Sequence, residues 1–498
     1  MDITFSNTVF NSLKPVLSQV ASEEQTQEMR LPEGMPDVGR VISAWGQCVV
    51  RSKEWNIDTI QCAAGMMIWV LYAPENGSAP QMINTWIPFQ FRWELPDGTP
   101  EGKLLVQCLT RFADARSVSP RKIMIRCGMS ALIQAYVSEK TTVASAEKEW
   151  PGIEVLNTKY PVRIQKEAGE KVFQLDEELS VPESAPKPDG IIYCAVSPCL
   201  LDCRVLTDKL AFRGEGKLHI LYRSQEGQLH SWDFSVPFSQ YTLLDEHYGS
   251  DAQAETFLCI TGLEAEVQEN GMFRVKCGIV CQYLISDRQM LEIAEDAYSL
   301  KNELDLQRIS INPNTILERR SEKLHPEQSV NAEVNIVPDV AFLPDFPRTS
   351  RLGEEMKVLW PGYFQVLFYG ADGQLYASTA RWEGEWKTTM DSNVFLRAIP
   401  GQPEVHAVIG SGAVSLSAEL PVTMEASTEQ SLSMITGIQL GQAIKRDTAR
   451  PSLILKRAGE QSLWELARNC GSTREAIRTA NALSGEPAVE QMLLIPVL

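Results

Sequence analysis

Hydrophobic and polar residues alternate along most of the chain, as they do in β-strands that bury one face. Residues 122–127 and 272–277 show this alternation clearly. Turn sequences that contain glycine lie between such segments at 75–77, 226–227 and 372–373, where a hairpin can reverse. The pattern therefore predicts a mainly β protein built from tandem antiparallel β-sandwich domains of about 100 residues each.

Several segments recur at a spacing of 149 or 150 residues, which indicates an internal repeat. The matching pairs are residues 31–37 with 181–186, 70–72 with 220–222, 87–89 with 236–238, and 126–128 with 276–278. Ordered matches at one spacing imply superposable domains. We therefore expect Tyr72 and Tyr222 to occupy equivalent positions, and Phe89 and Phe238 likewise.

A shorter third copy is predicted after Val337-Pro338-Asp339, because residues 367–375 resemble residues 221–229. The repeats lead to a plan of seven segments along the chain. This plan comprises an N-terminal segment 1–24, a first β-domain 25–140, a second β-domain 165–290, a connector 291–329, a divergent third β-domain 330–425, a linker 426–450 and a C-terminal domain 451–498.

Four segments lack a clear strand pattern. Apolar residues between positions 9 and 20 are spaced as in a helix, which Pro15 interrupts. Residues 138–148 are polar and charged, as expected of a connector, and residues 288–301 have helical content. Residues 424–449 fit either a terminal strand pair of the third copy or a tether to the C-terminal domain.

The pattern changes after Pro451 to a strand, two capped helices and a closing strand. Leu453-Ile454-Leu455 is an apolar run suited to a strand, and residues 492–496 form a second one. Residues 462–465 read Ser-Leu-Trp-Glu, a capping box that starts a helix, and Gly471 is placed to end it. A second box, Ser472-Thr473-Arg474-Glu475, predicts another helix up to Asn481.

This C-terminal segment resembles a LysM carbohydrate-recognition module. The matching positions are Gly459-Glu460, Leu463-Trp464, Leu466-Ala467, Ile477, Asn481 and Leu494-Ile495-Pro496. The resemblance implies a βααβ domain that binds N-acetylglucosamine chains, a peptidoglycan component, through two loops. These loops would be Gly459, Glu460, Gln461 and Ser462 in the first, and Asn481, Ala482, Leu483 and Ser484 in the second.

Gln461 is an extra residue in the first loop relative to the LysM pattern, so we expect weak or no sugar binding. A protein partner is expected at the same loops instead. Glu460→Lys or Asn481→Ala should then weaken capture of that partner without unfolding the module. Arg474, on the exposed face of the second helix, should matter little, and Trp464 is expected to be a core aromatic.

The opening Leu-Pro-Glu-Gly-Met-Pro-Asp-Val at 31–38, with Ile-Pro-Phe at 87–89, resembles the SPOCS domain of spore-coat assembly proteins. Two such domains, a divergent β-domain and a LysM domain resemble the module order of clostridial coat morphogenetic proteins. That family tethers the coat to the forespore surface during sporulation. The resemblance implies a scaffold in the mother-cell cytoplasm whose LysM module engages a coat-basement ATPase (SpoIVA-type) or another coat protein.

Composition fits such a scaffold and excludes some classes of partner. The chain has 498 residues, with 46 Lys and Arg against 64 Asp and Glu, and a net charge of −18. Nucleic-acid binding is disfavoured, because phosphate contacts need basic patches. No export signal is visible, and the longest apolar run, residues 63–72, is too short to span a bilayer. Eleven cysteines, an odd number, fit a reducing cytoplasm.

No catalytic or metal-binding constellation stands out, so neither an enzyme nor a cofactor is expected. The five histidines lack a metalloprotease spacing, and no phosphate-binding loop or nucleophile elbow is present. The spacing of Cys194, Cys199 and Cys203 does not suit a zinc site, and Cys277 and Cys281 are expected in the core. Two alternatives remain open, a cell-wall glycan-binding protein and a wall hydrolase targeted by LysM.

Overall fold

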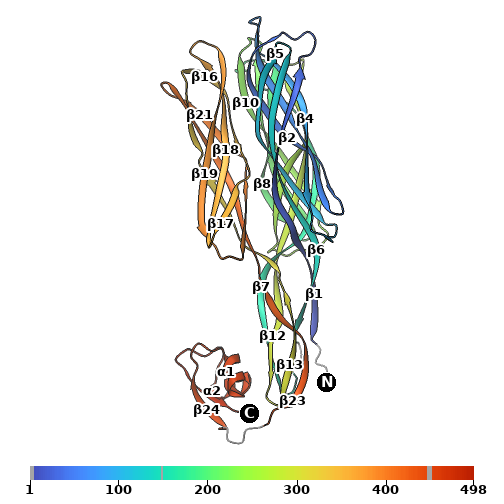
Figure 1. Cartoon of the computed structure of the whole chain (residues 1–498), viewed down its shortest axis with the longest axis vertical. Coiled ribbons are helices and arrows are strands. Elements are labelled where there is room, and N and C mark those ends of the chain that lie inside the picture. Colours follow the sequence, from blue (N-terminus) through green and yellow to red (C-terminus); the bar gives the residue numbers. More distant parts are fainter. Residues whose placement is uncertain (1–4, 147–149, 446–450) are drawn as a thin grey trace.

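The computed structural model describes residues 5–146, 150–445 and 451–498. Figure 1 shows an elongated molecule with three parts: a head of β-sandwiches, a narrow stalk of paired strands, and a small C-terminal unit beside the tip of the stalk. Strands make up most of the chain, and every strand pair is antiparallel. The predicted mainly β, antiparallel fold is therefore confirmed.

The first repeat packs two three-stranded sheets against each other, in the orders β1-β6-β5 and β2-β3-β4. Its strands are β1 Ser6–Arg30, β2 Val38–Trp55, β3 Thr59–Pro74, β4 Gln81–Glu94, β5 Lys103–Ser119 and β6 Lys122–Ser145. Inward-facing residues of both sheets form one core, in which Phe89 and Phe91 are fully buried. Alternation along residues 87–94 of β4 leaves every second residue in solvent, as the sequence pattern predicts.

The second repeat has the same topology, with sheets β7-β12-β11 and β8-β9-β10. Its strands are β7 Ile153–Leu179, β8 Pro188–Val205, β9 Lys209–Ser224, β10 Leu229–Leu243, β11 Gln253–Val267 and β12 Phe273–Ser299. The hydroxyl of Tyr72 donates to the carbonyl of Pro36 at 3.0 Å, and that of Tyr222 donates to Pro186 at 3.1 Å. The offset of 150 residues is therefore a structural repeat.

The third repeat keeps this plan but breaks its outer strands into pieces. Its strands are β13 Asn302–Ile311, β14 Asn314–Leu324, β15 Glu327–Asn331, β16 Val334–Pro344, β17 Arg348–Leu352, β18 Glu355–Gly370, β19 Leu375–Thr389, β20 Val394–Pro400, β21 Glu404–Ile409, β22 Ala413–Glu429 and β23 Leu432–Ala443. Strand β22 pairs with β14, β15, β20 and β21, and β18 pairs with β16, β17 and β19. The predicted third copy is present in this form.

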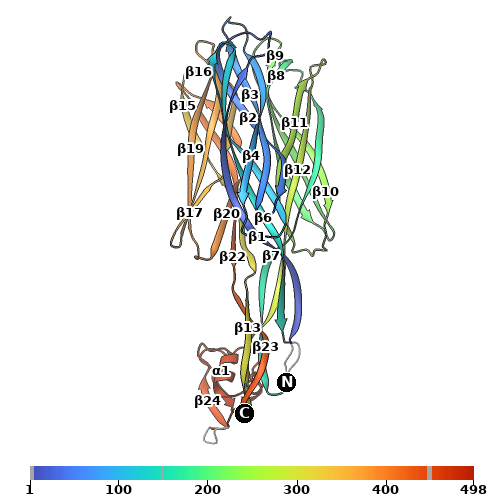
Figure 2. The same ribbon diagram turned by 45° about the vertical axis from the view of Figure 1, so that its right-hand side comes forward.

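The stalk consists of three two-stranded ribbons, one from each repeat. They are the paired ends of β1 and β6, of β7 and β12, and the pair β13 and β23 (Figure 2). Apolar residues from all three ribbons share one core. Its buried members are Val143, Ala144, Val162, Ile164, Leu291, Ile293, Ile311, Leu432 and Met434.

The stalk corrects several expectations about connectors. Residues 5–24 of the N-terminal segment lie in or next to β1, which pairs with β6 along its whole length, rather than in a helix. The described parts of 138–148, 291–329 and 426–450 are also mostly strands. Residues 1–4, 147–149 and 446–450 lie outside the described part. Polarity misled along β1 because most of its side chains are exposed, and helical spacing misled in β12 because a register shift between Ala294 and Asp296 interrupts the buried alternation.

The three repeats meet around a common centre through equivalent residues. Trp69, His219 and Gln365 stand at offsets of 150 and 146 residues on β3, β9 and β18. Trp69 packs edge-on against Tyr193 with ring centroids 5.3 Å apart. His219 Nε2 lies 2.8 Å from Asp339 Oδ1, and the Gln365 amide donates to Ser43 Oγ at 2.9 Å. The contacted residues, Ser43, Tyr193 and Asp339, are also equivalent to one another. The first repeat thus contacts the second, the second contacts the third and the third contacts the first, in a closed cycle.

Asp339 is the polar hub of this centre, because it joins all three repeats. Its carboxylate accepts from Trp45 Nε1 of the first repeat at 3.0 Å and contacts His219 of the second. The other ring nitrogen of His219 lies 2.6 Å from Asp233. Burial opposes protonation of His219, but the carboxylates of Asp339 and Asp233 outweigh it and raise its pKa to about 10. The imidazole is therefore a cation held between two anions.

A second polar contact joins repeats two and three nearer the stalk. Glu255 of β11 pairs with Arg319 of β14 at 3.1 Å and with Arg397 of β20. Glu425 of β22 completes the cluster by pairing with both arginines, 2.9 Å from Arg397. Burial acts to raise the pKa of Glu425, but the two guanidinium groups outweigh it and lower the pKa. These contacts join the three sandwiches into one body.

Candidate partner-binding surface of the C-terminal unit

The C-terminal unit has the expected order of elements: β24 Leu453–Arg457, α1 Leu463–Cys470, α2 Arg474–Asn481 and β25 Met492–Pro496. Strands β24 and β25 pair antiparallel. The two short helices cover one face of this pair, and Leu463, Leu466, Ile477, Leu493 and Ile495 form its core. Among the described residues, no helix is long and apolar enough to cross a membrane.

Local signals explain the helix boundaries. Ser462 caps α1, and its side chain and that of Glu465 each accept from the other's backbone N–H, which is the predicted capping box. Gly471 ends α1 at φ +66°, in the left-handed region that favours glycine. The second cap is Thr473 rather than Ser472, because it is the Thr473 side chain that accepts from the N–H of Ala476.

The first predicted binding loop, residues 459–462, is partly committed to local contacts. Gly459 has φ +62° and donates its N–H to the carbonyl of Val489 at 2.9 Å. Gln461 accepts a hydrogen bond from Lys456 Nζ at 2.9 Å, and the Ser462 side chain is used by the cap. The Glu460 side chain is exposed. Glu460 is therefore the member of this loop best placed to meet a partner.

The second predicted loop, residues 481–484, is anchored by Asn481. Its amide donates to the carbonyls of Ile477 at 2.8 Å and Leu494 at 2.6 Å, and its carbonyl accepts from the Leu494 N–H at 2.8 Å. Asn481 therefore ties α2 to β25, so Asn481→Ala would also remove contacts within the unit. Ala482 has φ +49°, Leu483 packs on the core, and Ser484 is exposed.

A third segment, residues 486–491, runs from the second loop toward β25 and contacts the first loop. The carboxylate of Glu486 accepts from the N–H of Leu463 at 2.7 Å, at the end of the first loop. Ala458 N–H donates to the carbonyl of Gln491 at 2.9 Å. The first loop therefore contacts the later part of the connection between α2 and β25. Leu483, at the start of that connection, packs against the core.

One side of the unit docks on the tip of the stalk. Tyr298 of β12 packs edge-on against Trp464 of α1, with ring centroids 4.8 Å apart, and donates its hydroxyl to the carbonyl of Ser472 at 2.8 Å. Asp296 accepts from Trp464 Nε1 at 3.1 Å and from Arg468 at 2.5 Å. Trp464 is thus a core aromatic, as expected, but its core is shared with the stalk.

Arg474 also belongs to this docking interface, which corrects its expected place on an exposed helix face. Its guanidinium donates to the carbonyl of Val155 at 3.1 Å, lies 3.7 Å from the Glu154 carboxylate, and stacks over Trp464 at 5.0 Å. A cation over an indole face gains electrostatic stabilisation in addition to the hydrogen bond. The docked side of the unit is therefore unavailable to a partner as long as this contact holds.

Docking leaves the outer face of the β24–β25 pair in solvent. Leu453, Leu455, Met492 and Leu494 point outward on it and are between 41% and 64% exposed. Leu455 and Leu494 are directly paired across the two strands. This aliphatic face was not singled out in the sequence, although the i, i+2 spacing of its leucines could have shown it.

The docking residues of the stalk were also missed. Asp296 and Tyr298 lie in the segment 288–301, whose composition suggested a helix. The structure places both on β12, and alternate residues of that strand face the unit. Cys277 and Cys281, in the earlier part of β12, are buried as expected. Cys194, Cys199 and Cys203 lie along β8 as free thiols.

Comparison with known proteins gives one family match. A family model described as SipL, SPOCS domain, matches residues 189–267, which extend from β8 to the end of β11 in the second repeat. No curated protein matches the chain, and no solved structure does. The match relates the chain to sporulation and the spore coat, in line with the resemblance noted in the first repeat.

Proposed function

We propose that the protein is a non-enzymatic scaffold in endospore coat assembly, located in the mother cell at the forespore surface. The observation that carries this proposal is the SPOCS match in a head of three repeats, combined with a separate βααβ unit at the far end of a stalk. A head and a terminal unit spaced apart in this way suit a tether between two layers. Catalysis would instead require convergent reactive groups.

The C-terminal unit is the proposed anchor, acting as a LysM-type module on a coat-basement ATPase of the SpoIVA type or another coat protein. The exposed Glu460 loop and the aliphatic face of β24 and β25 are both available to that partner. Gln461 and Ser462 are already hydrogen-bonded within the unit, which leaves fewer polar groups for a sugar. A protein partner therefore fits this surface better than an N-acetylglucosamine chain.

The anchor is tested by capture of the purified coat-basement ATPase on the full-length chain. Glu460→Lys should reduce the captured amount about tenfold, since reversing a charge at an interface can cost more than 1 kcal/mol. Glu475→Lys is the matched control, because Glu475 is an exposed acid on α2. Equal capture by both variants would remove the loop from the interface. Loss on Leu455→Ser alone would place the partner on the sheet face.

Glycan binding is tested separately by calorimetric titration of the full-length chain with chito-oligosaccharides. We expect no binding tighter than about 100 μM, which corresponds to roughly −5.5 kcal/mol. Tighter binding that Glu460→Lys abolishes would instead support the alternative, a cell-wall glycan-binding protein.

A further inference from the structure

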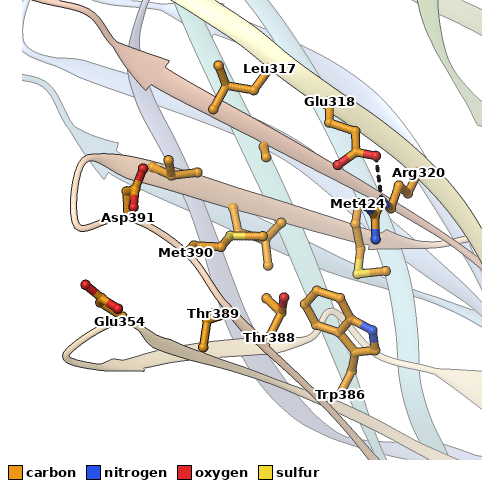
Figure 3. Close-up of a pocket in the computed structure, with 13 residues that line it drawn as sticks. Leu317, Glu318, Arg320, Glu354, Trp386, Thr388, Thr389, Met390, Asp391 and Met424 are labelled. Atoms are coloured by element: carbon orange, nitrogen blue, oxygen red, sulfur yellow. Dashed lines mark hydrogen bonds and ion pairs between the residues drawn. The ribbon is translucent and has the colours of Figure 1, made fainter. Parts of the chain in front are cut away.

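The third sandwich is open at one end. A cleft of about 410 Å³ lies there between its two sheets (Figure 3). Trp386, Met390, Met424 and Leu317 supply much of its apolar lining, and Glu354 and Asp391 stand at one side of it. Its volume falls in the range of about 300–1,000 Å³ that is usual for ligand sites.

A short connection explains why the end is open. Leu95, Leu244 and Met390 are equivalent, because each donates its N–H to a carbonyl in the turn before the central strand of its repeat, which is β3, β9 or β18. The three distances are 2.9, 3.0 and 2.8 Å. From that point to the next strand the chain runs over residues 95–102 in the first repeat and 244–252 in the second, but only over 390–393 in the third.

The longer connection of the second repeat adds a buried side chain that the third repeat does not have. Leu95 joins the core of the first repeat, and its equivalent Met390 lines the cleft. Tyr248 joins the core of the second repeat and donates its hydroxyl to Glu167 at 3.0 Å. The connection of the third repeat is too short to supply such a residue. Arg351 holds this connection in place by donating to the carbonyls of Asp391 at 2.7 Å and of Val394.

The opposite wall is also irregular. The pairing of β14 with β22 shifts register between Ile316 and Glu318, so Leu317 is left as a β-bulge. Leu317 lines the cleft and is 55% exposed. A bulge of this kind redirects a side chain away from the regular pleat.

The charges around the cleft are mostly negative. Glu318 pairs with Arg320 at 2.6 Å, so their charges balance. Within the described residues, Glu354 and Asp391 form no salt bridge, although Arg351 lies close to the backbone of Asp391. Both acids flank an apolar cavity that includes two methionines, whose flexible side chains adapt to different shapes.

We propose that this cleft binds a segment of a partner protein in which a large apolar side chain is flanked by lysine or arginine. The apolar side chain would fill the space that Tyr248 occupies in the second repeat. The flanking cations would face Glu354 and Asp391. This site lies on the head, so it is independent of the anchor proposed for the C-terminal unit.

The test uses a fluorescein-labelled peptide, Gly-Lys-Lys-Leu-Phe-Lys-Lys-Gly, and fluorescence anisotropy with the full-length chain at about 0.15 M salt. We expect saturable binding that is lost when the Leu-Phe pair is replaced by Ala-Ala. A peptide with glutamate in place of lysine should not bind. Absence of binding by the first peptide, or equal binding by all three, would overturn the proposal.

Two protein variants locate the site. Thr388→Trp places a large ring in the cleft from β19 and should weaken binding about tenfold. Glu354→Lys combined with Asp391→Lys should do the same. The matched control, Glu183→Lys with Glu226→Lys, makes the same change in net charge at exposed acids of the second repeat. Equal weakening by both charge variants, or unchanged binding in Thr388→Trp with unchanged thermal unfolding, would show that the peptide lies elsewhere.

Discussion

The head and the C-terminal unit are held to the rest of the chain in different ways. In the head, each repeat contacts both others through buried groups such as Asp339 and Gln365, which join strands far apart in sequence. The C-terminal unit has its own small core and meets the stalk on one side, around Asp296 and Tyr298. The head should therefore unfold as one body, whereas the unit should be able to detach while both parts stay folded.

The largest effect is expected from the core of the second repeat. Phe238 is buried against Phe173, with ring centroids 4.9 Å apart. Phe238→Ala should lower the free energy of unfolding of the head by about 3–5 kcal/mol, because it leaves a cavity. Denaturant unfolding measures this, and Tyr241→Ala, at an exposed position of the same strand, is the control. A similarly small loss of unfolding free energy in both variants would contradict the prediction, because it would mean that neighbouring side chains fill the cavity left by Phe238.

The contact between the second and third repeats is the next test. Glu255→Ala removes one carboxylate from Arg319 and Arg397 and leaves a buried excess of positive charge. We expect a loss of about 3 kcal/mol, the usual scale for breaking a buried ion pair. Glu264→Ala, an exposed acid on the same strand, should change little. If Glu255→Ala split the unfolding into two transitions, the repeats would be less coupled than the shared core implies.

A smaller and different effect is expected at the tip of the stalk. Asp296→Ala deprives Trp464 and Arg468 of their acceptor, at a cost of about 1–3 kcal/mol for a charged partner. Asp296 also pairs with Arg308 of β13 at 3.0 Å, so the loss should fall on docking and on the stalk rather than on the head. Hydrogen exchange should rise at the docking face, while the denaturant midpoint of the head stays the same. Asp305→Ala on β13 is the control, and a lowered midpoint in Asp296→Ala would contradict the independence of the two parts.

The last perturbation is pH, which changes no residue and acts gradually through His219. His219 keeps its proton in the folded head up to about pH 10, whereas an unfolded histidine loses it near pH 6.5. Its contribution to stability is therefore complete below pH 6.5 and is lost as the pH rises through about 10. The free energy of unfolding should fall by at most about 1.4 kcal/mol per pH unit in this window. His219→Gln should remove that slope, and a slope that persists would assign it to another group.

Local residue patterns predicted many features of the head. Gly77, Gly227 and Gly373 mark the hairpin turns of the three repeats, and all three have positive φ, between 72° and 85°. A turn that needs this backbone conformation selects glycine whatever surrounds it. Alternation in the central strands likewise predicted which residues are buried. In the C-terminal unit, the Ser462 cap and Gly471 stop set the first helix for the same local reason.

The stalk, the docking and the open cleft depended on partners distant in sequence. Residues 5–24 and 291–299 have no local signal for a strand, and they extend because β6 and β7 pair with them. The sequence pattern placed Trp464 and Arg474 in an isolated module. In the structure, Trp464 packs against Tyr298 of the stalk, and Arg474 donates to the carbonyl of Val155. The cleft arises from the absence of a closing residue after Met390, which only alignment of the folded repeats reveals.

The sequence by itself determined the alternation, the turns, the caps and the period of the repeats, because each of these depends on the conformational preferences of a few neighbouring residues. Tertiary structure alone decided the cyclic contacts of Trp69, His219 and Gln365, the three-ribbon stalk and the seat of the C-terminal unit. Those features are stabilised by strand pairing and by burial of side chains between segments more than a hundred residues apart, so no short stretch of sequence specifies them.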